Sequence, residues 1–165
     1  MNSKDKGNAF ERKISNLLSK RFETVTGLTQ AFRRNIDSGS FFGGSNQRRT
    51  QTHNTENAVF GDINVPSNFK FSLECKHYKE APSFKSIMKQ DVKSWDLWIS
   101  QAKQDCDNAG KEMLLIVKYN GVDEIAILDK LPQGITPIMN YKGNFVINLD
   151  TLLELADEVF FDIQA

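Results

Sequence analysis

The sequence predicts one α/β (α+β) domain in which helices flank a single mixed β-sheet. Two observations favour this fold class. Helix-like and strand-like segments are interleaved along the chain, and the continuous apolar run MLLIVKY at 113–119 has the length of a buried central strand. At 165 residues the chain has the length of one domain and can bury a substantial core, so we expect a single domain over residues 1–165.

Four elements are predicted in the first half of the chain from its residue pattern. They are an amphipathic helix at 8–22 and strands at about 28–35, 59–65 and 69–77. The turn-forming residues Pro66-Ser67-Asn68 separate the last two strands, so we expect these strands to pair as a hairpin.

Five elements are predicted in the second half. They are a long helix at 83–109, strands at 113–119, 124–129 and about 145–149, and a final helix from about 150 to 160. Gly110 is expected to end the long helix, and Asn120-Gly121 is a strong hairpin signal. Asp91 is the one polar residue in the apolar stripe of the long helix.

Residues 37–58 are rich in Ser, Gly, Asn and Thr, and they have almost no apolar content beyond Phe41 and Phe42. This composition predicts a long mobile loop, which also carries Arg48 and Arg49. A loop of this length inside a small domain is usually functional or disordered.

The formal net charge is zero, but the charges are unevenly distributed. Residues 1–55 hold ten Lys and Arg against four Asp and Glu, whereas residues 112–165 hold three against nine. A basic front and an acidic back suggest one face for a polyanion, or two faces that meet across an oligomer. Chance segregation along a chain that folds its ends together is the alternative.

The sequence indicates a cytoplasmic protein. Its polar start is not followed by an apolar run, which argues against a signal peptide, and no window approaches the length of a membrane span. Cys75 and Cys106 fit free thiols in a reducing cytosol better than a disulfide framework or a zinc set. We therefore expect no membrane segment and no small-molecule cofactor.

Three charged residues in the stretch FGDINVPSNFKFSLECKHYKE, at 60–80, are the best candidates for chemistry. Strand alternation places Glu74 and Lys76 on one face. A hairpin that pairs Val65 with Phe69, or one slipped by two residues, adds Asp62 to that face, whereas a one-residue slip separates it. The alternative is that all three are solvated residues on the wet face of a sheet. The triplet Glu-x-Lys has little weight alone, because Glu11-Arg12-Lys13 repeats it in the first helix.

The chemistry that these residue types suit is phosphodiester hydrolysis. Two neighbouring carboxylates repel each other unless a cation lies between them. Such hard oxygen ligands suit Mg²⁺ or Mn²⁺, which bind through one or two carboxylates plus phosphate. A neighbouring lysine can orient or deprotonate a water, or neutralise charge on the phosphate.

The segments FGDI and LECK resemble the D…ExK core of the PD-(D/E)xK nuclease superfamily. The opening KGNAFERKISNLL resembles the first helix of its archaeal-type Holliday junction resolvases and their phage and bacterial relatives. The resemblance covers about residues 6–118 and implies a restriction-endonuclease-like core. The corresponding residues are Lys6-Gly7, Phe10-Glu11, Arg33-Arg34, the SGSFFGG loop that begins at Ser38, Asp62 and Glu74-Cys75-Lys76.

The resemblance implies a role for each catalytic candidate. Glu11, Asp62 and Glu74 would bind the metal ions, and Lys76 would be the catalytic lysine. Glu11 has a local alternative, because with Asn8 as the helix N-cap it would occupy the capping-box position.

Gln101 resembles a glutamine that relatives often place on the helix after the ExK motif, where it supports the active site or touches DNA. Its alternative is a solvent-facing helix glutamine. Lys118 stands at the end of the MLLIVKY strand, where relatives often carry a basic residue.

DNA contacts are expected from basic and polar residues in several segments. They are Lys6, Arg33, Arg34, Ser38, Arg48, Arg49, Lys85, Lys89 and Lys118. Lys85, Lys89 and Lys93 form a row at four-residue spacing, which either tracks phosphates or is the wet face of the helix. Trp95 and Trp98 are expected to pack in the core rather than stack on bases.

These features predict a Mg²⁺-dependent, structure-selective endonuclease that cuts branched DNA, chiefly Holliday junctions, with Mn²⁺ able to substitute. A homodimer is expected, because the two strands cut in a four-way junction need two symmetry-related active sites. The alternatives are another PD-(D/E)xK nuclease of the restriction, nickase or exonuclease type, and a non-catalytic DNA-binding module. Either a phage genome or a chromosome could encode the chain.

Overall fold

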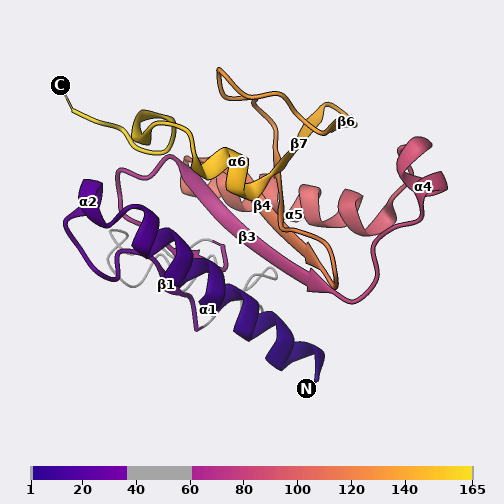
Figure 1. The fold of residues 1–165 in the computed structure, drawn as a ribbon, viewed down its shortest axis with the longest axis horizontal. Coiled ribbons are helices and arrows are strands. Elements are labelled where there is room, and N and C mark those ends of the chain that lie inside the picture. Colours follow the sequence, from indigo (N-terminus) through magenta and orange to yellow (C-terminus); the bar gives the residue numbers. More distant parts are fainter. Residues whose placement is uncertain (1, 37–60, 165) are drawn as a thin grey trace.

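The computed structural model describes residues 2–36 and 61–164, and it contains a mixed five-stranded sheet with helices on both sides (Figure 1). The strand order is β3-β4-β5-β7-β6, in which β3 is parallel to β4 and the other neighbouring pairs are antiparallel. The predicted fold class is confirmed: this is an α+β, restriction-endonuclease-like arrangement.

The described residues contain seven strands, five α-helices and one 3₁₀ helix. The strands are β1 (Arg33–Arg34), β2 (Ile63–Asn64), β3 (Phe71–Tyr78), β4 (Glu112–Tyr119), β5 (Ile125–Leu128), β6 (Met139–Tyr141) and β7 (Asn144–Asn148). The helices are α1 (Ser3–Arg21), α2 (Glu23–Thr26), α4 (Phe84–Met88), α5 (Lys93–Ala109), α6 (Leu149–Leu153) and the 3₁₀ helix η2 (Asp157–Val159). None of these helices combines the length and the apolar character that crossing a membrane requires.

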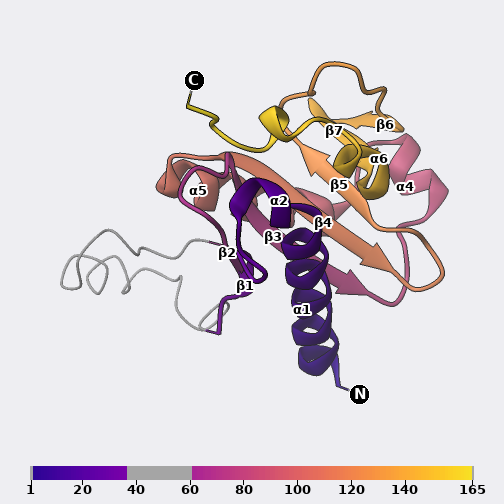
Figure 2. The ribbon, with the colours of Figure 1, turned by 60° about the vertical axis from the view of Figure 1, so that its left-hand side comes forward.

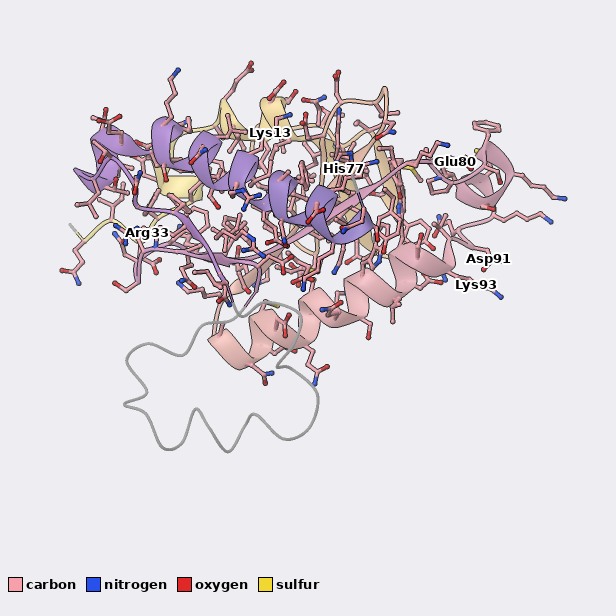
Figure 3. The ribbon with its side chains drawn as sticks, turned by 90° about the horizontal axis from the view of Figure 1, so that it is seen from below. Lys13, Arg33, His77, Glu80, Asp91 and Lys93 are labelled. Atoms are coloured by element: carbon pink, nitrogen blue, oxygen red, sulfur yellow. The ribbon has the colours of Figure 1, made fainter. Side chains whose placement is uncertain are left out.

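β4 divides the core into two layers. Alternate side chains of this buried strand face opposite sides of the sheet. Leu114 and Ile116 pack with α1, whereas Leu115 packs with Trp95 and Trp98 of α5. α1 and α5 therefore cover opposite faces of the sheet, as Figure 3 shows. The predictions of a buried central strand at 113–119 and of core-packed tryptophans are both confirmed.

The first helix begins earlier than predicted. α1 starts at Ser3 rather than at residue 8, because the Asn2 side chain caps it by accepting a 2.8 Å hydrogen bond from the Asp5 N–H. Asn8 lies inside the helix and is not its N-cap, so the capping-box alternative for Glu11 is wrong. Glu11 instead projects from the middle of a continuous helix.

The long helix predicted at 83–109 is two helices, because the backbone of Gln90 is left-handed, with φ of 52°. The Asp91 N–H donates to the Ser86 carbonyl at 2.9 Å, and the Gln90 N–H donates to the Ile87 carbonyl at 3.0 Å. This pattern is a Schellman ending, in which Gln90 takes the position usually held by glycine. The Val92 N–H then donates to the Tyr141 hydroxyl at 2.9 Å, which fixes the redirected chain.

The predicted lysine row is therefore wrong as a feature of one helix. Lys85 lies in α4, Lys89 is the residue that caps its C-terminus, and Lys93 begins α5. Lys85 and Lys89 remain one helical turn apart, whereas Lys93 lies on another helix after the change of direction. Asp91, the exception in the apolar stripe, lies in this interruption and is exposed.

The strands before β3 are shorter than predicted and pair differently. β1 holds two residues of the strand predicted at 28–35, and β2 holds two of the strand predicted at 59–65. β2 pairs antiparallel with β1, beside the edge of β3 (Figure 2), so the predicted hairpin of two long paired strands is wrong. The cause is the local geometry around Asp62, described below.

The second half of the sheet follows the prediction more closely. Gly110 ends α5 with a φ of 65°, and the Asn120-Gly121 turn joins the antiparallel strands β4 and β5. β6 was not predicted, because its turn to β7 uses Lys142 and Gly143, with φ of 47° and 79°, rather than an Asn-Gly pair. The final helix predicted at 150–160 ends at Leu153 and is followed by η2.

An aromatic cluster joins the end of α1 to three other parts of the chain. The Phe22 ring lies 4.9 to 6.0 Å, centroid to centroid, from the rings of Phe32, Phe69, Phe160 and Phe161. Phe22 is fully buried. The cluster holds β1, the start of β3 and the C-terminal segment together.

We predict that Phe22→Ala lowers the free energy of unfolding by about 3–5 kcal/mol, because it leaves a cavity among these rings. Phe84→Ala is the matched control, since the Phe84 side chain is 77% exposed and its loss should cost at most about 0.5 kcal/mol. Chemical denaturation of both variants measures the difference. Similar losses in the two variants would contradict a structural role for the cluster.

Candidate active site

Asp62 completes the open edge of β3. Its backbone N–H donates a 2.8 Å hydrogen bond to the Leu73 carbonyl, and its carboxylate Oδ2 accepts a 2.8 Å hydrogen bond from the Cys75 N–H. A side-chain oxygen thus takes the place of the carbonyl that a neighbouring strand would supply. Asp62 is therefore held beside Glu74, as predicted, although by a different contact from the predicted hairpin ladder.

Gly61 allows this close approach of the chain to β3. A Cβ atom at this position would stand 2.4 Å from the Leu73 carbonyl oxygen and 3.2 Å from Ser72 Oγ. The backbone φ of 81° is also one that residues with side chains rarely adopt. A glycine is required immediately before the aspartate for both reasons.

Asn35 fastens the same two residues from the other side. Its backbone N–H donates to the Asp62 carbonyl at 2.9 Å, and its side-chain amide donates to the Gly61 carbonyl at 3.2 Å. Asn35 is buried and directly follows β1. The Asp62 backbone is therefore fixed between β3 and the chain that carries Arg33 and Arg34.

Glu74 and Lys76 lie on the face of β3 that α5 covers. Strand alternation puts them opposite Leu73 and Cys75, which belong to the core layer under α1. Lys76 Nζ lies 2.7 Å from Glu74 Oε1. Glu74 is only 3% exposed, so the alternative of a solvated wet face does not hold for this residue.

The charges of this group act strongly on one another. Burial and then the negative charge of Asp62 raise the pKa of Glu74 to about 8, although Lys76 opposes the rise. Burial alone would lower the pKa of Lys76, but Glu74 and Asp62 raise it above its ordinary value. Lys76 is therefore a persistent cation at the centre of an acidic group.

Glu11 reaches the border of this group from α1. Burial and the charge of Asp62 raise its pKa. Its carboxylate Oε2 pairs with Arg34 Nε at 2.5 Å, and Arg34 Nη2 donates to the Asn8 side chain at 2.6 Å. Glu11 therefore lies in the electrostatic field of Asp62 and Lys76, but its nearest partner is Arg34.

Asp105 is an acid in the same field that the sequence pattern did not indicate. It lies on α5 and is half-buried, and its pKa is raised by burial and by Asp62 and lowered by Lys76. Gln101, predicted to support the site, lies one helical turn earlier on α5 and is exposed. An acid on a helix normally indicates its wet face, which is why Asp105 was missed.

The donor set fits a small divalent cation through two of its acids. The described residues contain no group of three or more His, Cys, Asp or Glu side chains arranged to hold a metal. Mg²⁺ needs fewer protein ligands, because it is usually bound by one or two carboxylates together with phosphate oxygens and water. Asp62 and Glu74 supply two carboxylates. Burial and then repulsion by Asp62 raise the pKa of Glu74, and a cation bound to both carboxylates would offset the repulsion.

The predicted DNA contacts fall in several places. Lys6 Nζ donates to the Asn120 side chain at 2.8 Å, and Lys118 Nζ donates to the Val122 carbonyl, so both lie near the β4–β5 turn. Arg33 is exposed on β1, and its partner Arg34 is held by Glu11. Lys85 and Lys89 are exposed on and beside α4. The predicted loop at 37–58, with Ser38, Arg48 and Arg49, lies outside the described residues.

We predict that Gly61→Ala lowers the free energy of unfolding by about 2 kcal/mol or more, because the new Cβ would meet the Leu73 carbonyl in a strained backbone conformation. Gly7→Ala is the control. Gly7 lies in α1 with open space around it, so alanine there should stabilise the protein by up to about 1 kcal/mol. Thermal or urea unfolding measures the stability of the two variants. Equal effects would contradict the close approach of Gly61 to the Leu73 carbonyl.

The raised pKa of Glu74 predicts that the free energy of unfolding depends on pH. Its folded pKa of about 8 exceeds its ordinary value of 4.5, so the folded protein binds the extra proton between these limits. The associated stability is fully present below about pH 4.5 and is lost as the pH rises through about 8. One pKa unit corresponds to about 1.4 kcal/mol, so the loss can reach several kcal/mol.

Urea unfolding in EDTA, from about pH 5 to about pH 9, measures this loss. The free energy of unfolding of Glu74→Gln should fall less over this range than that of the wild type, because glutamine does not titrate. Parallel curves for the two proteins would show that Glu74 keeps an ordinary pKa in the fold.

Comparison with known families agrees with this geometry. The family model described as "Phage putative PDDEXK endonuclease" matches residues 2–156, which include the whole of the described site. Searches of curated proteins and of solved structures found no match. Nucleases of the PD-(D/E)xK superfamily generally depend on divalent metal ions. The match extends over most of the chain, which therefore belongs to the phage PDDEXK endonuclease family and is a PD-(D/E)xK nuclease.

Proposed function

We propose that this nuclease is a Mg²⁺-dependent, structure-selective endodeoxyribonuclease that cuts branched DNA, chiefly Holliday junctions, by phosphodiester hydrolysis. The observation that carries the proposal is the Asp62 carboxylate, hydrogen-bonded to the Cys75 N–H beside the buried Glu74–Lys76 pair. Two acids and a lysine on one rigid strand edge are the groups that this reaction requires.

Asp62 and Glu74 are the residues that would hold the metal. Glu11 would join them when Arg34 turns to a DNA phosphate, because the two now form an ion pair on the border of the acidic group. When bound, Mg²⁺ supplies a Lewis acid that polarises a phosphoryl oxygen and makes water more acidic. Mn²⁺ prefers the same kind of oxygen ligand and should substitute.

Lys76 is best suited to stabilising negative charge. Its raised pKa keeps it protonated near neutral pH, so it acts as a hydrogen-bond donor rather than as a proton acceptor. The 2.7 Å contact with Glu74 holds its Nζ beside the acids. A donor fixed in this place stabilises the charge that develops on the phosphate oxygens in the transition state, and it can orient the attacking water.

Phosphate contacts are proposed for the basic residues around this edge. Arg33 is exposed on β1, next to the segment that fixes Asp62, and Arg34 lies beside Glu11. Lys6 and Lys118 would extend the contacts toward the β4–β5 turn. Contacts of this kind read the shape of the DNA backbone more than its base sequence.

Gln101 and the remaining predicted residues are proposed to contact DNA at the periphery of the site. Gln101 would touch the DNA from the exposed side of α5, one turn from Asp105. Ser38, Arg48 and Arg49 would add contacts from the segment between β1 and β2. A homodimer is proposed because a four-way junction presents two equivalent strands to two symmetry-related sites.

We predict that Asp62→Asn, Glu74→Gln and Lys76→Ala each reduce the rate of junction cleavage in Mg²⁺ by about 100-fold or more, because each removes charge at the reacting phosphate. Lys130→Ala is the control, since Lys130 pairs with Glu112 at the surface and should leave the rate unchanged. Single-turnover cleavage of a synthetic four-way junction measures the rates. Cleavage at the wild-type rate by Lys76→Ala would refute the assignment.

The substrate class requires a second comparison. Cleavage should be mapped on a four-way junction, a linear duplex and a flap of matched sequence. Symmetric nicks confined to the branch point are expected for a junction resolvase, whereas equal cutting of the linear duplex would favour a restriction-type enzyme, a nickase or an exonuclease. DNA binding with no cleavage and no metal-dependent heat in calorimetry would favour a non-catalytic DNA-binding module.

A further inference from the structure

A pocket of about 540 Å³ lies at the carboxyl end of β3, between this strand, α4 and the start of α5. Its wall includes Tyr78 and Trp98, together with the charged residues Glu80, Asp91 and Lys93. Figure 3 shows Asp91 and Lys93 beside the start of α5, and Glu80 on the segment that leads from β3 to α4. The volume is within the range of sites that bind small organic groups, about 300–1,000 Å³.

Tyr78 connects the pocket to the catalytic face. Alternation along β3 puts Glu74, Lys76 and Tyr78 on the same side of the strand, and two residues of a strand span about 7 Å. The pocket therefore begins about one nucleotide step beyond Lys76. A DNA strand whose phosphate lies at Lys76 would carry the neighbouring base past Tyr78.

The aromatic wall is firmly supported and partly open. The Tyr78 and Trp98 rings lie 4.8 Å apart at an angle of 34°, and Tyr78 is 52% exposed whereas Trp98 is buried. Tyr119 also lines the pocket, and its hydroxyl accepts a 2.8 Å hydrogen bond from Trp95 Nε1. An exposed ring on a fixed base is the platform on which nucleic-acid bases stack.

The charges of the pocket select against phosphate and for the edge of a base. Glu80 and Asp91 are carboxylates, which repel phosphate but accept hydrogen bonds from exocyclic amino groups. Lys93 adds one cation beside them. The Schellman ending of α4 at Gln90 creates this arrangement, since it turns the chain so that Asp91 and Lys93 line one pocket.

We propose that this pocket receives one unstacked base of the DNA substrate, adjacent to the cleaved phosphate, and stacks it on Tyr78. The proposal rests on the proposed function in that the ligand is DNA with bases outside a continuous stack. A linear duplex keeps its bases paired, and extracting one costs a few kcal/mol. A branch point interrupts the stack, so the pocket would favour branched DNA.

The test uses the Lys76→Ala protein, so that binding is measured without cleavage. Fluorescence of 2-aminopurine reports loss of stacking on neighbouring bases, and this base also carries an amino group for Glu80 or Asp91. It is placed either at the branch point of a four-way junction or in the middle of one arm. We expect a fluorescence change on binding for the branch-point label, and none for the label in the arm.

Tyr78→Ala in this background should abolish the fluorescence change and weaken junction binding about tenfold or more, while affinity for a linear duplex stays the same. Tyr78→Phe should retain both properties, because the ring remains. Phe84→Ala removes an exposed aromatic side chain that does not line the pocket, and it should change neither. Thermal unfolding of each variant excludes a loss of fold as the cause.

The proposal is overturned if the fluorescence change or the junction affinity is the same in Tyr78→Ala and Tyr78→Phe. It is also overturned if the protein binds a junction with an abasic site at the branch point as tightly as it binds the intact junction. These results are independent of cleavage. If the signal depends on Tyr78 but the protein with Lys76 intact cuts no DNA, the pocket is supported and the proposed cleavage is refuted. If the protein with Lys76 intact cuts junctions but Lys76→Ala gives no such signal, the cleavage is supported and the pocket is refuted.

Discussion

One side chain completes the edge of the main sheet, and the candidate site depends on that contact. An edge strand leaves backbone N–H and carbonyl groups unpaired. In β3, the Asp62 N–H pairs with the Leu73 carbonyl and the Asp62 carboxylate pairs with the Cys75 N–H. The carboxylate oxygen that accepts from the Cys75 N–H thus belongs to the acid beside Glu74. The same carboxylate closes the edge of the sheet and belongs to the candidate site, so the hydrogen bond that completes β3 also fixes the position of the carboxylate.

The same contact makes the site electrostatically costly. Asp62 and Glu74 are both buried, and Lys76 is the cation that pairs with Glu74. Glu11 on α1 and Asp105 on α5 lie in the same field, because burial and then the charge of Asp62 raise the pKa of each. The protein keeps repelling acids where well-packed apolar residues would be more stable. Such a conflict between stability and local charge is typical of active sites, and a cation bound there would relieve it.

Structural features that depend on local residue pattern could be predicted from the sequence, whereas features that depend on contacts between distant segments could not. Strand alternation placed Glu74 and Lys76 on one face, and the apolar run at 113–119 identified the buried strand. The proximity of Asp62 and Glu74 was predicted, but from a hairpin that does not form. Asp62 is held beside β3 by its side chain, which accepts a hydrogen bond from the Cys75 N–H, and sequence alternation does not reveal such a contact. The end of α4 could not be foreseen, since the Tyr141 hydroxyl that holds Val92 comes from a distant strand.

Asn35 has a consequence for what fixes the position of Asp62. Its hydrogen bonds to Gly61 and Asp62 fasten together two points that are far apart in the sequence. The position of the Asp62 carboxylate is therefore set by hydrogen bonds from both sides of the site, and not by the covalent path along the chain from Asn35 to Gly61.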